Sequence, residues 1–206
     1  MKPQSIAGLY AITPDWDDTA RLLRAVAAAL EGGARLLQYR NKHVDRQRRL
    51  EQALGLSALA NKAGATFIVN DDVELALEVD ADGVHLGETD GDIARARKRL
   101  GAHKLIGASC YNRLELAAPA LAAGADHIAF GSVFSSATKP SARRAPLDIF
   151  AQARHLKVPI VAIGGINSEN ATQVIAAGAT AVAVISDLFD AADVAAQARR
   201  FADLFA

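Results

Sequence analysis

Short apolar runs recur along this chain, and segments with alanine and leucine at helical spacing separate them. Because the runs do not alternate apolar with polar residues, both faces of each predicted strand should be buried, as in a parallel sheet. The predicted strands cover residues 8–12, 36–39, 66–69, 83–86, 105–108, 127–130, 160–163 and 181–185. The predicted helices cover residues 19–30, 45–63, 73–78, 92–100, 114–123, 147–155, 168–177 and 191–204.

These segments form eight strand–helix units with no linker between them. Strict alternation of strands and helices requires parallel strands and right-handed crossovers. Eight units of about 25 residues predict a closed (β/α)8 TIM barrel, a single α/β catalytic domain that occupies residues 1–206. The alternative is an open doubly wound sheet, but no Gly-x-Gly-x-x-Gly motif follows the first strand.

Composition limits the partners of the protein. Lys plus Arg and Asp plus Glu number 23 each among 206 residues, so no net charge attracts nucleic acid or an acidic membrane. No apolar run approaches the roughly 18 residues of a membrane helix, and no signal region opens the chain, so we expect a cytoplasmic protein. Cys110 is the only cysteine, which excludes an internal disulfide and predicts a buried thiol. The oligomeric state stays open, a homo-oligomer included.

The ends of the last two predicted strands suit an anion. Gly164 and Gly165 follow the seventh strand, and Ser186 follows the eighth. Glycine lets backbone N–H groups approach a phosphate closely, and the helices that follow point their positive ends the same way. Barrels build phosphate sites after these two strands, although a Gly-Gly pair serves a plain turn equally well.

Basic residues follow the second predicted strand, where a barrel builds its mouth. Arg40 and Lys42 are two residues apart, so an extended backbone turns both toward one side, and together they suit a diphosphate. A solvated basic loop explains them equally well. Lys139, in the long polar loop after the sixth strand, would add a third cation to the same mouth.

Acidic residues near the neighbouring strand ends suit a hard cation. Asn70 and Asp71 follow the third strand, and Asp90 lies just beyond the fourth. Mg²⁺ prefers oxygen ligands and shares them with phosphate and water, so Asp71 and Asp90 are candidate ligands for one such ion. Two alternatives remain: Asp90 caps the next helix, or Asp72 replaces Asp71.

Ser109 ends the fifth predicted strand, and its hydroxyl is expected to bind a ligand by a hydrogen bond. It is not expected to be a nucleophile, because no Gly-x-Ser-x-Gly motif and no His–acid pair accompany it. His85 and His127 lie within predicted strands, and we expect both to be satisfied core residues.

Seven motifs along the chain resemble, in order and approximate spacing, those of the thiamine-phosphate synthase family. The resemblance runs from the first predicted strand to the last, and seven motifs in register are highly specific. The motifs are Gln38-x-Arg40-x-Lys42, Val69-Asn70-Asp71, Gly83-Val84-His85-Leu86-Gly87, Gly107-x-Ser109, Phe134-x-x-x-Thr138-Lys139, Ile163-Gly164-Gly165-Ile166 and Val184-Ile185-Ser186.

The resemblance implies a TIM-barrel transferase with two small-molecule substrates and Mg²⁺. Such an enzyme joins 4-amino-2-methyl-5-hydroxymethylpyrimidine diphosphate to 4-methyl-5-(2-phosphooxyethyl)thiazole and releases diphosphate. By resemblance, the pyrimidine diphosphate is bound by Gln38, Tyr39, Arg40, Asn41, Lys42, Asn70, Ser109 and Lys139, of which Arg40, Lys42, Ser109 and Lys139 are the catalytic set. The thiazole phosphate is bound by Ser136, Ala137, Thr138, Gly165, Ile185 and Ser186, and Mg²⁺ by Asp71 and Asp90.

Family chemistry implies a dissociative substitution, in which diphosphate leaves before the thiazole nitrogen attacks the pyrimidine methylene cation. This reaction requires charge neutralisation and positioning of two reactants, and no protein nucleophile. The absence of a catalytic triad is therefore expected.

Three positions depart from the usual family pattern. Glu88 stands where Gln is common, which brings a carboxylate near the expected metal. Ser135-Ser136-Ala137 replaces a Pro-Thr-x run. Asp187 stands where Ala is common, beside the expected phosphate, so we expect its side chain to turn away, for example as a cap of the last helix.

Three other functions compete with this one. A thiazole tautomerase on the same barrel carries a histidine after the sixth-strand glycine, but here Gly131 precedes Ser132. A sugar-phosphate isomerase or aldolase needs a base or Schiff-base lysine inside the barrel, for which only Lys139 is available. A non-catalytic phosphate-binding barrel has no need for the charged residues at the strand ends.

Overall fold

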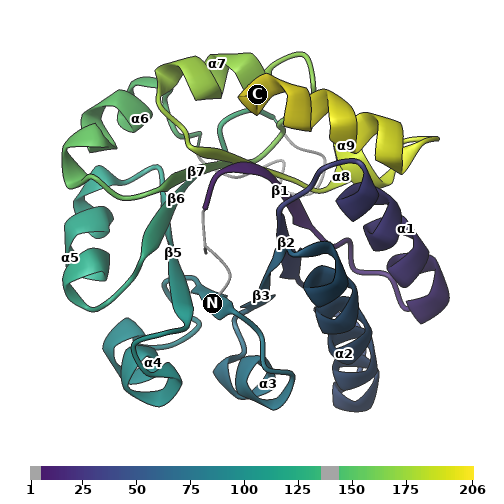
Figure 1. Ribbon diagram of the computed structural model, residues 1–206. Coiled ribbons are helices and arrows are strands. Elements are labelled where there is room, and N and C mark those ends of the chain that lie inside the picture. The colour runs from purple at the N-terminus through teal and green to yellow at the C-terminus, as the bar shows by residue number, and fades with distance from the viewer. Residues whose placement is uncertain (1–5, 136–143) are drawn as a thin grey trace.

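The computed structural model describes residues 6–135 and 144–206, and its eight strands form a closed parallel barrel (Figure 1). Each strand pairs with its neighbours in sequence, and β8 closes on β1 with Gly8 beside Ala181. This is the predicted (β/α)8 fold, not an open sheet. The strands are β1 Gly8–Ile12, β2 Leu36–Tyr39, β3 Thr66–Asn70, β4 Gly83–Leu86, β5 Leu105–Tyr111, β6 His127–Gly131, β7 Ile160–Ile163 and β8 Ala181–Val184.

Helices surround the barrel and cover the outer face of its strands (Figure 1). Five of them begin at an aspartate whose carboxylate accepts a hydrogen bond from the backbone N–H three residues later, which stabilises a helix by about 1 kcal/mol. Those caps are Asp18, Asp45, Asp72, Asp92 and Asp193. The helices are α1 Thr19–Glu31, α2 Arg46–Ala63, α3 Val73–Glu78, α4 Ile93–Leu100, α5 Ala117–Ala122, α6 Asp148–Ala153, α7 Ala171–Ala177, α8 Ser186–Phe189 and α9 Val194–Ala202, with 3-10 turns at Leu114–Leu116, Arg154–Leu156 and Asp203–Phe205.

Several predicted boundaries are wrong, each for a local reason. The fifth strand continues to Tyr111 through a register shift after Ser109. The predicted helix 168–177 begins only at residue 171, because Asn167 and Asn170 each accept the other's backbone N–H in a turn. The predicted helix 191–204 begins at residue 194, after its Asp193 cap, and the separate short helix α8 precedes it.

The apolar core has two layers, as expected for strands buried on both faces. The larger layer lies between the strands and the helices and includes Leu37, Phe67 and Val69. The smaller layer lies inside the barrel and includes Tyr10, Leu36 and Ile68. Because successive residues of a strand face opposite sides, this division shows which side chains at a strand end point into the barrel.

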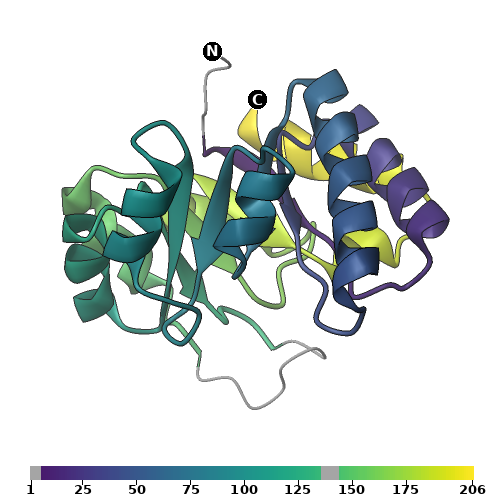
Figure 2. The ribbon, with the colours of Figure 1, turned by 90° about the horizontal axis from the view of Figure 1, so that it is seen from below.

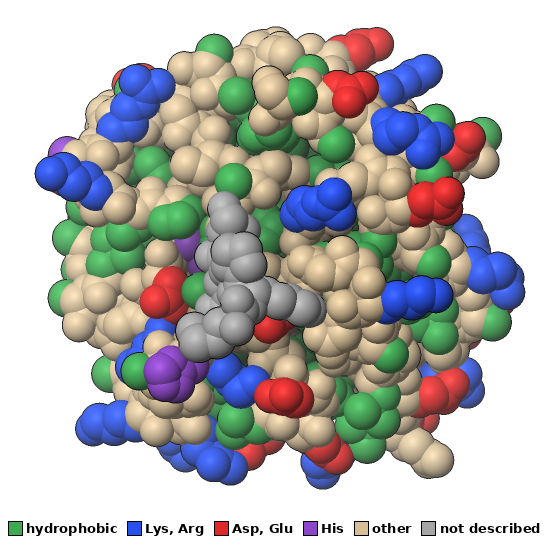
Figure 3. Space-filling model, in the orientation of Figure 1, with side chains coloured by type: hydrophobic (Ala, Val, Ile, Leu, Met, Phe, Trp, Pro, Cys, Tyr) green, Lys and Arg blue, Asp and Glu red, His purple; other side chains and the backbone are tan. Residues whose placement is uncertain are grey.

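The carboxyl ends of the strands lie together at the lower edge of Figure 2, where the loops that follow them form the rim of the barrel. On the face shown in Figure 3, Lys and Arg side chains are interspersed with Asp and Glu side chains. Among the described residues, no helix has the length and apolar character needed to cross a membrane. Cys110 is buried, as predicted, and burial raises the pKa of its thiol to about 12.

Candidate functional site

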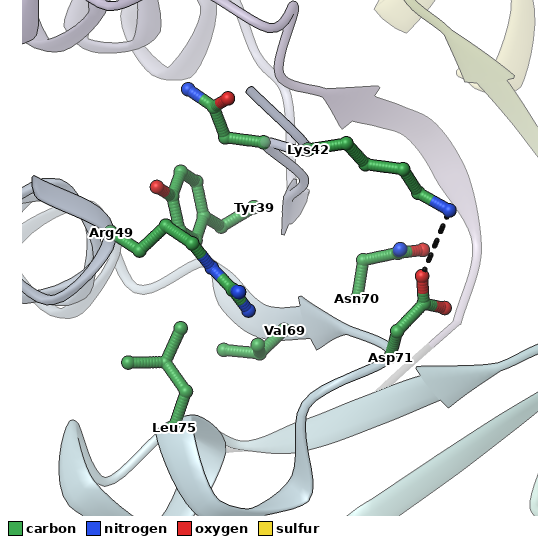
Figure 4. A pocket seen from close by; sticks show the side chains of 8 residues that line it. Tyr39, Lys42, Arg49, Val69, Asn70, Asp71 and Leu75 are labelled. Atoms are coloured by element: carbon green, nitrogen blue, oxygen red, sulfur yellow. Dashed lines mark ion pairs between the residues drawn. The ribbon is translucent and has the colours of Figure 1, made fainter. Parts of the chain in front are cut away.

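A pocket of about 260 Å³ opens at the rim beside the ends of β2 and β3 (Figure 4). Lys42, Asn70 and Asp71 lie together on one side of it, and Arg49 reaches in from α2. The pocket thus joins five residues that the sequence analysis selected at the ends of two different strands. Its lining residues are Tyr39, Asn41, Lys42, Arg49, Val69, Asn70, Asp71 and Leu75.

Asp71 is the residue on which the charges of this pocket converge. Its backbone has φ 65°, a left-handed conformation that turns the chain sharply at the end of β3. Lys42 Nζ lies 3.2 Å from Asp71 Oδ2. The pKa of Asp71 is raised, first by burial and then by a hydrogen bond with Asp90 and repulsion from its carboxylate, while Lys42 opposes the shift. Asp71 and Asp90 are therefore neighbours, although 19 positions separate them in the sequence.

The loop after β4 holds Asp90 in place. Its Oδ2 accepts a hydrogen bond from Gly87 N at 3.0 Å, and a side chain at position 87 would overlap that oxygen. The cap of α4 is Asp92, so the alternative in which Asp90 caps this helix is wrong. Glu88 points to Arg113, whose Nη2 lies 2.6 Å from its carboxylate.

Asp72 has a structural environment that differs from that of Asp71. Its Oδ1 accepts from Leu75 N at 2.9 Å and caps α3, and its Oδ2 pairs with Arg49 Nη2 at 2.8 Å. Both carboxylate oxygens of Asp72 are thus engaged by the protein. Asp71 is the better candidate for a ligand.

Arg40 is anchored by two residues that the sequence analysis missed. Its Nη1 lies 2.6 Å from Asp15 Oδ2, and Asp15 Oδ1 accepts from Lys42 N at 2.8 Å. Thr13 Oγ accepts from Arg40 N and donates to Arg40 O, both at 2.8 Å. Thr13 and Asp15 follow the first strand as the other site residues follow theirs, and this position was the signal that could have identified them.

Residues 38 to 42 alternate between two sides of the barrel wall. Gln38 is buried inside, where its Nε2 donates to Tyr10 Oη at 3.0 Å. Tyr39 and Asn41 face the helices, and both donate to Gln52 Oε1, at 2.9 Å and 3.1 Å. The structure therefore brings the side chains of Tyr39 and Asn41 to the helix side of the pocket, while Gln38 lies within the barrel.

Ser109 lies on β5 with its side chain half-buried, and its Oγ is 2.9 Å from His85 Nε2. His85 and His127 are core residues, but the expectation that both are satisfied is wrong. Within the described part of the chain, His85 Nδ1 and both nitrogens of His127 are buried without a hydrogen-bond partner. Burial lowers the pKa of His85 to about 4 and that of His127 to about 3.

The ends of β7 and β8 form the other part of the rim. Gly164 and Gly165 have φ 102° and 64°, which favour glycine, and side chains there would overlap Ser132 and Ser135. Ser186 begins α8, and the first N–H groups of a helix have no partner within it.

Asp187 turns to α9, where its Oδ2 accepts from Gln197 Nε2 at 2.6 Å and from Ser168 N at 3.3 Å. It does not cap α9, because Asp193 does. We name Lys42, Asn70, Asp71 and Asp90 the β2–β4 half of the rim, and Gly164, Gly165, Ile185 and Ser186 the β7–β8 half.

Four predicted site residues, Ser136, Ala137, Thr138 and Lys139, lie outside the described residues. Within those that are described, His, Cys, Asp and Glu form no group of three suited to a metal ion. The Asp71–Asp90 pair still fits Mg²⁺, because this ion takes one or two carboxylates and completes its shell with phosphate and water oxygens. Burial and the neighbouring Asp90 together raise the pKa of Asp71, and a bound cation would favour its ionised form.

Comparisons with known proteins agree with one another. The family profile described as thiamine monophosphate synthase matches residues 9–188. The thiamine-phosphate synthase of Chromobacterium violaceum is 60% identical over 203 residues, covering 98% of each chain. The enzyme of that name from Methylobacillus flagellatus is 56% identical and covers 97% of this chain and 96% of its own. The solved structure of thiamine phosphate pyrophosphorylase from Pyrococcus furiosus is 37% identical, with a TM-score of 0.86 over 97% of this chain and 95% of its own.

Proposed function

The chain belongs to the thiamine monophosphate synthase family and is a transferase of thiamine biosynthesis, and from that premise we propose its substrates and mechanism. The substrates are 4-amino-2-methyl-5-hydroxymethylpyrimidine diphosphate and 4-methyl-5-(2-phosphooxyethyl)thiazole. The products are thiamine monophosphate and diphosphate. The diphosphate group binds at the β2–β4 half of the rim, and the thiazole phosphate at the β7–β8 half.

The observation that carries this proposal is that Lys42 and Asp71 line one pocket and that Asp90 lies beside Asp71. Two neighbouring carboxylates repel each other, and a bound cation between them would relieve that repulsion. Lys42 lies 3.2 Å from Asp71 and is half exposed, so its ammonium can turn from Asp71 to a bound phosphate oxygen. Asp15 keeps the Arg40 guanidinium beside the same strand end.

Asp71 and Asp90 are the residues that would hold Mg²⁺. When bound, the ion supplies positive charge that neutralises the leaving diphosphate. Lys42 and Arg40 contribute the protein's own positive charge to the same group, preorganised by Asp71 and Asp15. Lys139 is proposed to join them.

The reaction breaks the bond between the pyrimidine methylene carbon and a diphosphate oxygen, and the electron pair leaves with diphosphate. The thiazole nitrogen then donates its lone pair to the methylene carbon and forms the new C–N bond. No proton is transferred, so the chain needs no general base. Its task is to hold the two reactants in line and to exclude water from the cation.

The β7–β8 half binds the thiazole phosphate without a charged side chain. Gly165 has no side chain of its own to hinder the approach of a phosphate to its backbone N–H, and Ser186 adds a hydroxyl at the first turn of α8. The Asp187 carboxylate does not repel a phosphate at this site, since it accepts hydrogen bonds from Gln197 and Ser168. Together, the two halves keep the two phosphorylated ligands apart.

The competing tautomerase activity has less support. The residue after Gly131 is Ser132, whose hydroxyl donates to Phe134 O at 2.8 Å and offers no titrating group. A non-catalytic barrel leaves the Asp71–Asp90 pair unexplained.

Diphosphate release from the purified protein tests the proposal. We expect release only when both the pyrimidine diphosphate and the thiazole phosphate are present, and only with Mg²⁺. Equal turnover in EDTA and in Mg²⁺ would reject the mechanism. Aromatisation of a non-aromatic tautomer of the thiazole phosphate, with no pyrimidine diphosphate present, would support the tautomerase instead.

A further inference from the structure

Two histidines face each other inside the barrel, directly below Ser109. His85 on β4 and His127 on β6 both pair in register with Gly107 on the intervening β5. Their ring centroids are 5.8 Å apart, and the rings are inclined by 40°. A side chain at position 107 would overlap His85 Nδ1 and His127 Nε2, so these two nitrogens lie beside the same point. The glycine makes room for the pair.

The pair is short of hydrogen bonds. Of its four ring nitrogens, only His85 Nε2 has a partner among the described residues, namely Ser109 Oγ. A buried polar atom left unpaired destabilises the fold. Both rings are buried and neither has an acidic hydrogen-bond partner among the described residues, so each is neutral and carries one N–H and one acceptor nitrogen.

The neutral rings and a ligand at Ser109 together determine which atom donates and which accepts in each hydrogen bond. An anionic ligand offers only hydrogen-bond acceptors, so a Ser109 hydroxyl that binds it must donate its single O–H to that ligand. The oxygen of Ser109 can then only accept from His85, which places the His85 proton on Nε2. His85 Nδ1 is left as an acceptor, and the group beside it at Gly107 is His127 Nε2.

We propose that His127, acting through His85, positions the Ser109 hydroxyl as a donor to the bound pyrimidine diphosphate. His127 Nε2–H donates to His85 Nδ1, a link that a small ring rotation closes, and His85 Nε2–H donates to Ser109 Oγ. The relay pairs two of the three unpartnered nitrogens. Both histidines are positioning residues, since neither touches the ligand, and the ligand's identity rests on the proposed function.

The tautomer of His85 tests the relay without any measurement of activity. In the ¹⁵N-labelled full-length protein at neutral pH, imidazole NMR should find the His85 proton on Nε2 and Nδ1 unprotonated. A proton on Nδ1 would overturn the relay, because His85 would then accept from Ser109. A protein that has the expected tautomer but does not turn over the pyrimidine diphosphate contradicts the proposed function and still supports the relay.

A double-mutant cycle tests the consequence for the ligand. His127→Phe keeps a ring of similar size and removes the donor, and we expect KM for the pyrimidine diphosphate to rise about tenfold, as for the loss of one hydrogen bond. In a Ser109→Ala background, the same substitution should have no further effect. An equal rise in both backgrounds would show a merely structural role and overturn the proposal.

His127→Gln is the matched control, because its amide N–H takes the place of the Nε2–H. This variant should restore KM to within about twofold of the wild type, with the Tm of each variant measured alongside. If His127→Phe does not fold, KM of His127→Gln and the tautomer of His85 test the relay instead. Loss of affinity in His127→Gln equal to that in Ser109→Ala would contradict the relay.

Discussion

The two halves of the rim differ in how they offer charge to a ligand. In the β2–β4 half, side chains carry the charge: Lys42 and Asp71 are 3.2 Å apart, and burial together with Asp90 raises the pKa of Asp71. In the β7–β8 half, Gly165 and Ser186 offer backbone and hydroxyl groups instead. Side-chain charge suits a diphosphate that must leave with a metal ion, whereas backbone N–H groups suit a phosphate that only has to be held.

The largest expected effect comes from removing one carboxylate of the β2–β4 half. Asp71→Asn should lower the rate of diphosphate release by about 100- to 1000-fold, the usual cost of losing one preorganised electrostatic contact. The matched control is Asp72→Asn next to it, which keeps a capping side chain at α3 but loses the ion pair with Arg49, and which should cost at most about 1 kcal/mol of stability with little loss of rate. If the two variants lose rate equally, Asp71 has no special place in the site.

The buried histidines below the rim should make the free energy of unfolding depend on pH. The folded-state pKa values of about 4 for His85 and about 3 for His127 lie below the ordinary 6.5, so the unfolded chain binds protons first on acidification. The free energy of unfolding should therefore fall from about pH 6.5 toward pH 4, by up to about 1.4 kcal/mol per histidine and pH unit.

Urea unfolding at pH 7 and pH 5.5 measures this fall. Asp71 contributes with the opposite sign, because its pKa is raised. His127→Phe should therefore show a smaller fall than the wild type, and this difference isolates the histidine contribution. An equal pH dependence in both proteins would mean that His127 binds a proton as readily in the folded state as in the unfolded state.

A side chain at the β7–β8 half should affect one substrate only. Gly165→Ala places a methyl group against the backbone of Phe134 and Ser135, and we expect KM for the thiazole phosphate to rise about tenfold while KM for the pyrimidine diphosphate is unchanged. Gly64→Ala is the control, since Gly64 has nearly the same φ and open space around it. Steady-state kinetics with each substrate varied in turn measures the two KM values. Equal changes in both would contradict the assignment of one substrate to each half of the rim.

The smallest effect is expected at Asp15, which holds Arg40 without being part of either half. Asp15→Asn keeps the size of the side chain but weakens its pairing with the Arg40 guanidinium. KM for the pyrimidine diphosphate should rise about threefold, in keeping with the modest value of a partly exposed ion pair. Addition of salt should reduce the difference between variant and wild type, and a variant with unchanged KM at low salt would show that Arg40 needs no anchor.

The fold could be predicted because each strand is buried on both faces and therefore reads as a short apolar run. Where a strand leaves the core this signal fails, as at Ser109, where β5 continues to Tyr111 through a register shift. Helix starts failed where side chains form local turns, as with Asn167 and Asn170.

The site was predictable in its residue types but not in its pairings. Asp71 lies beside Asp90 because the backbone at Asp71 is left-handed. No sequence pattern predicts that conformation. The pairing of Asp15 with Arg40 joins residues 25 positions apart, and the unpaired nitrogens of His127 follow only from packing around Gly107.

A crystal structure of the protein with thiamine monophosphate, Mg²⁺ and diphosphate is the most direct test of the division between the two halves. We predict diphosphate and the metal between Lys42, Asp71 and Asp90, and the ester phosphate of the product at Gly165 and Ser186. A structure with the diphosphate at Gly165 and Ser186, or with Asp71 and Asp90 turned away from the metal, would contradict this account.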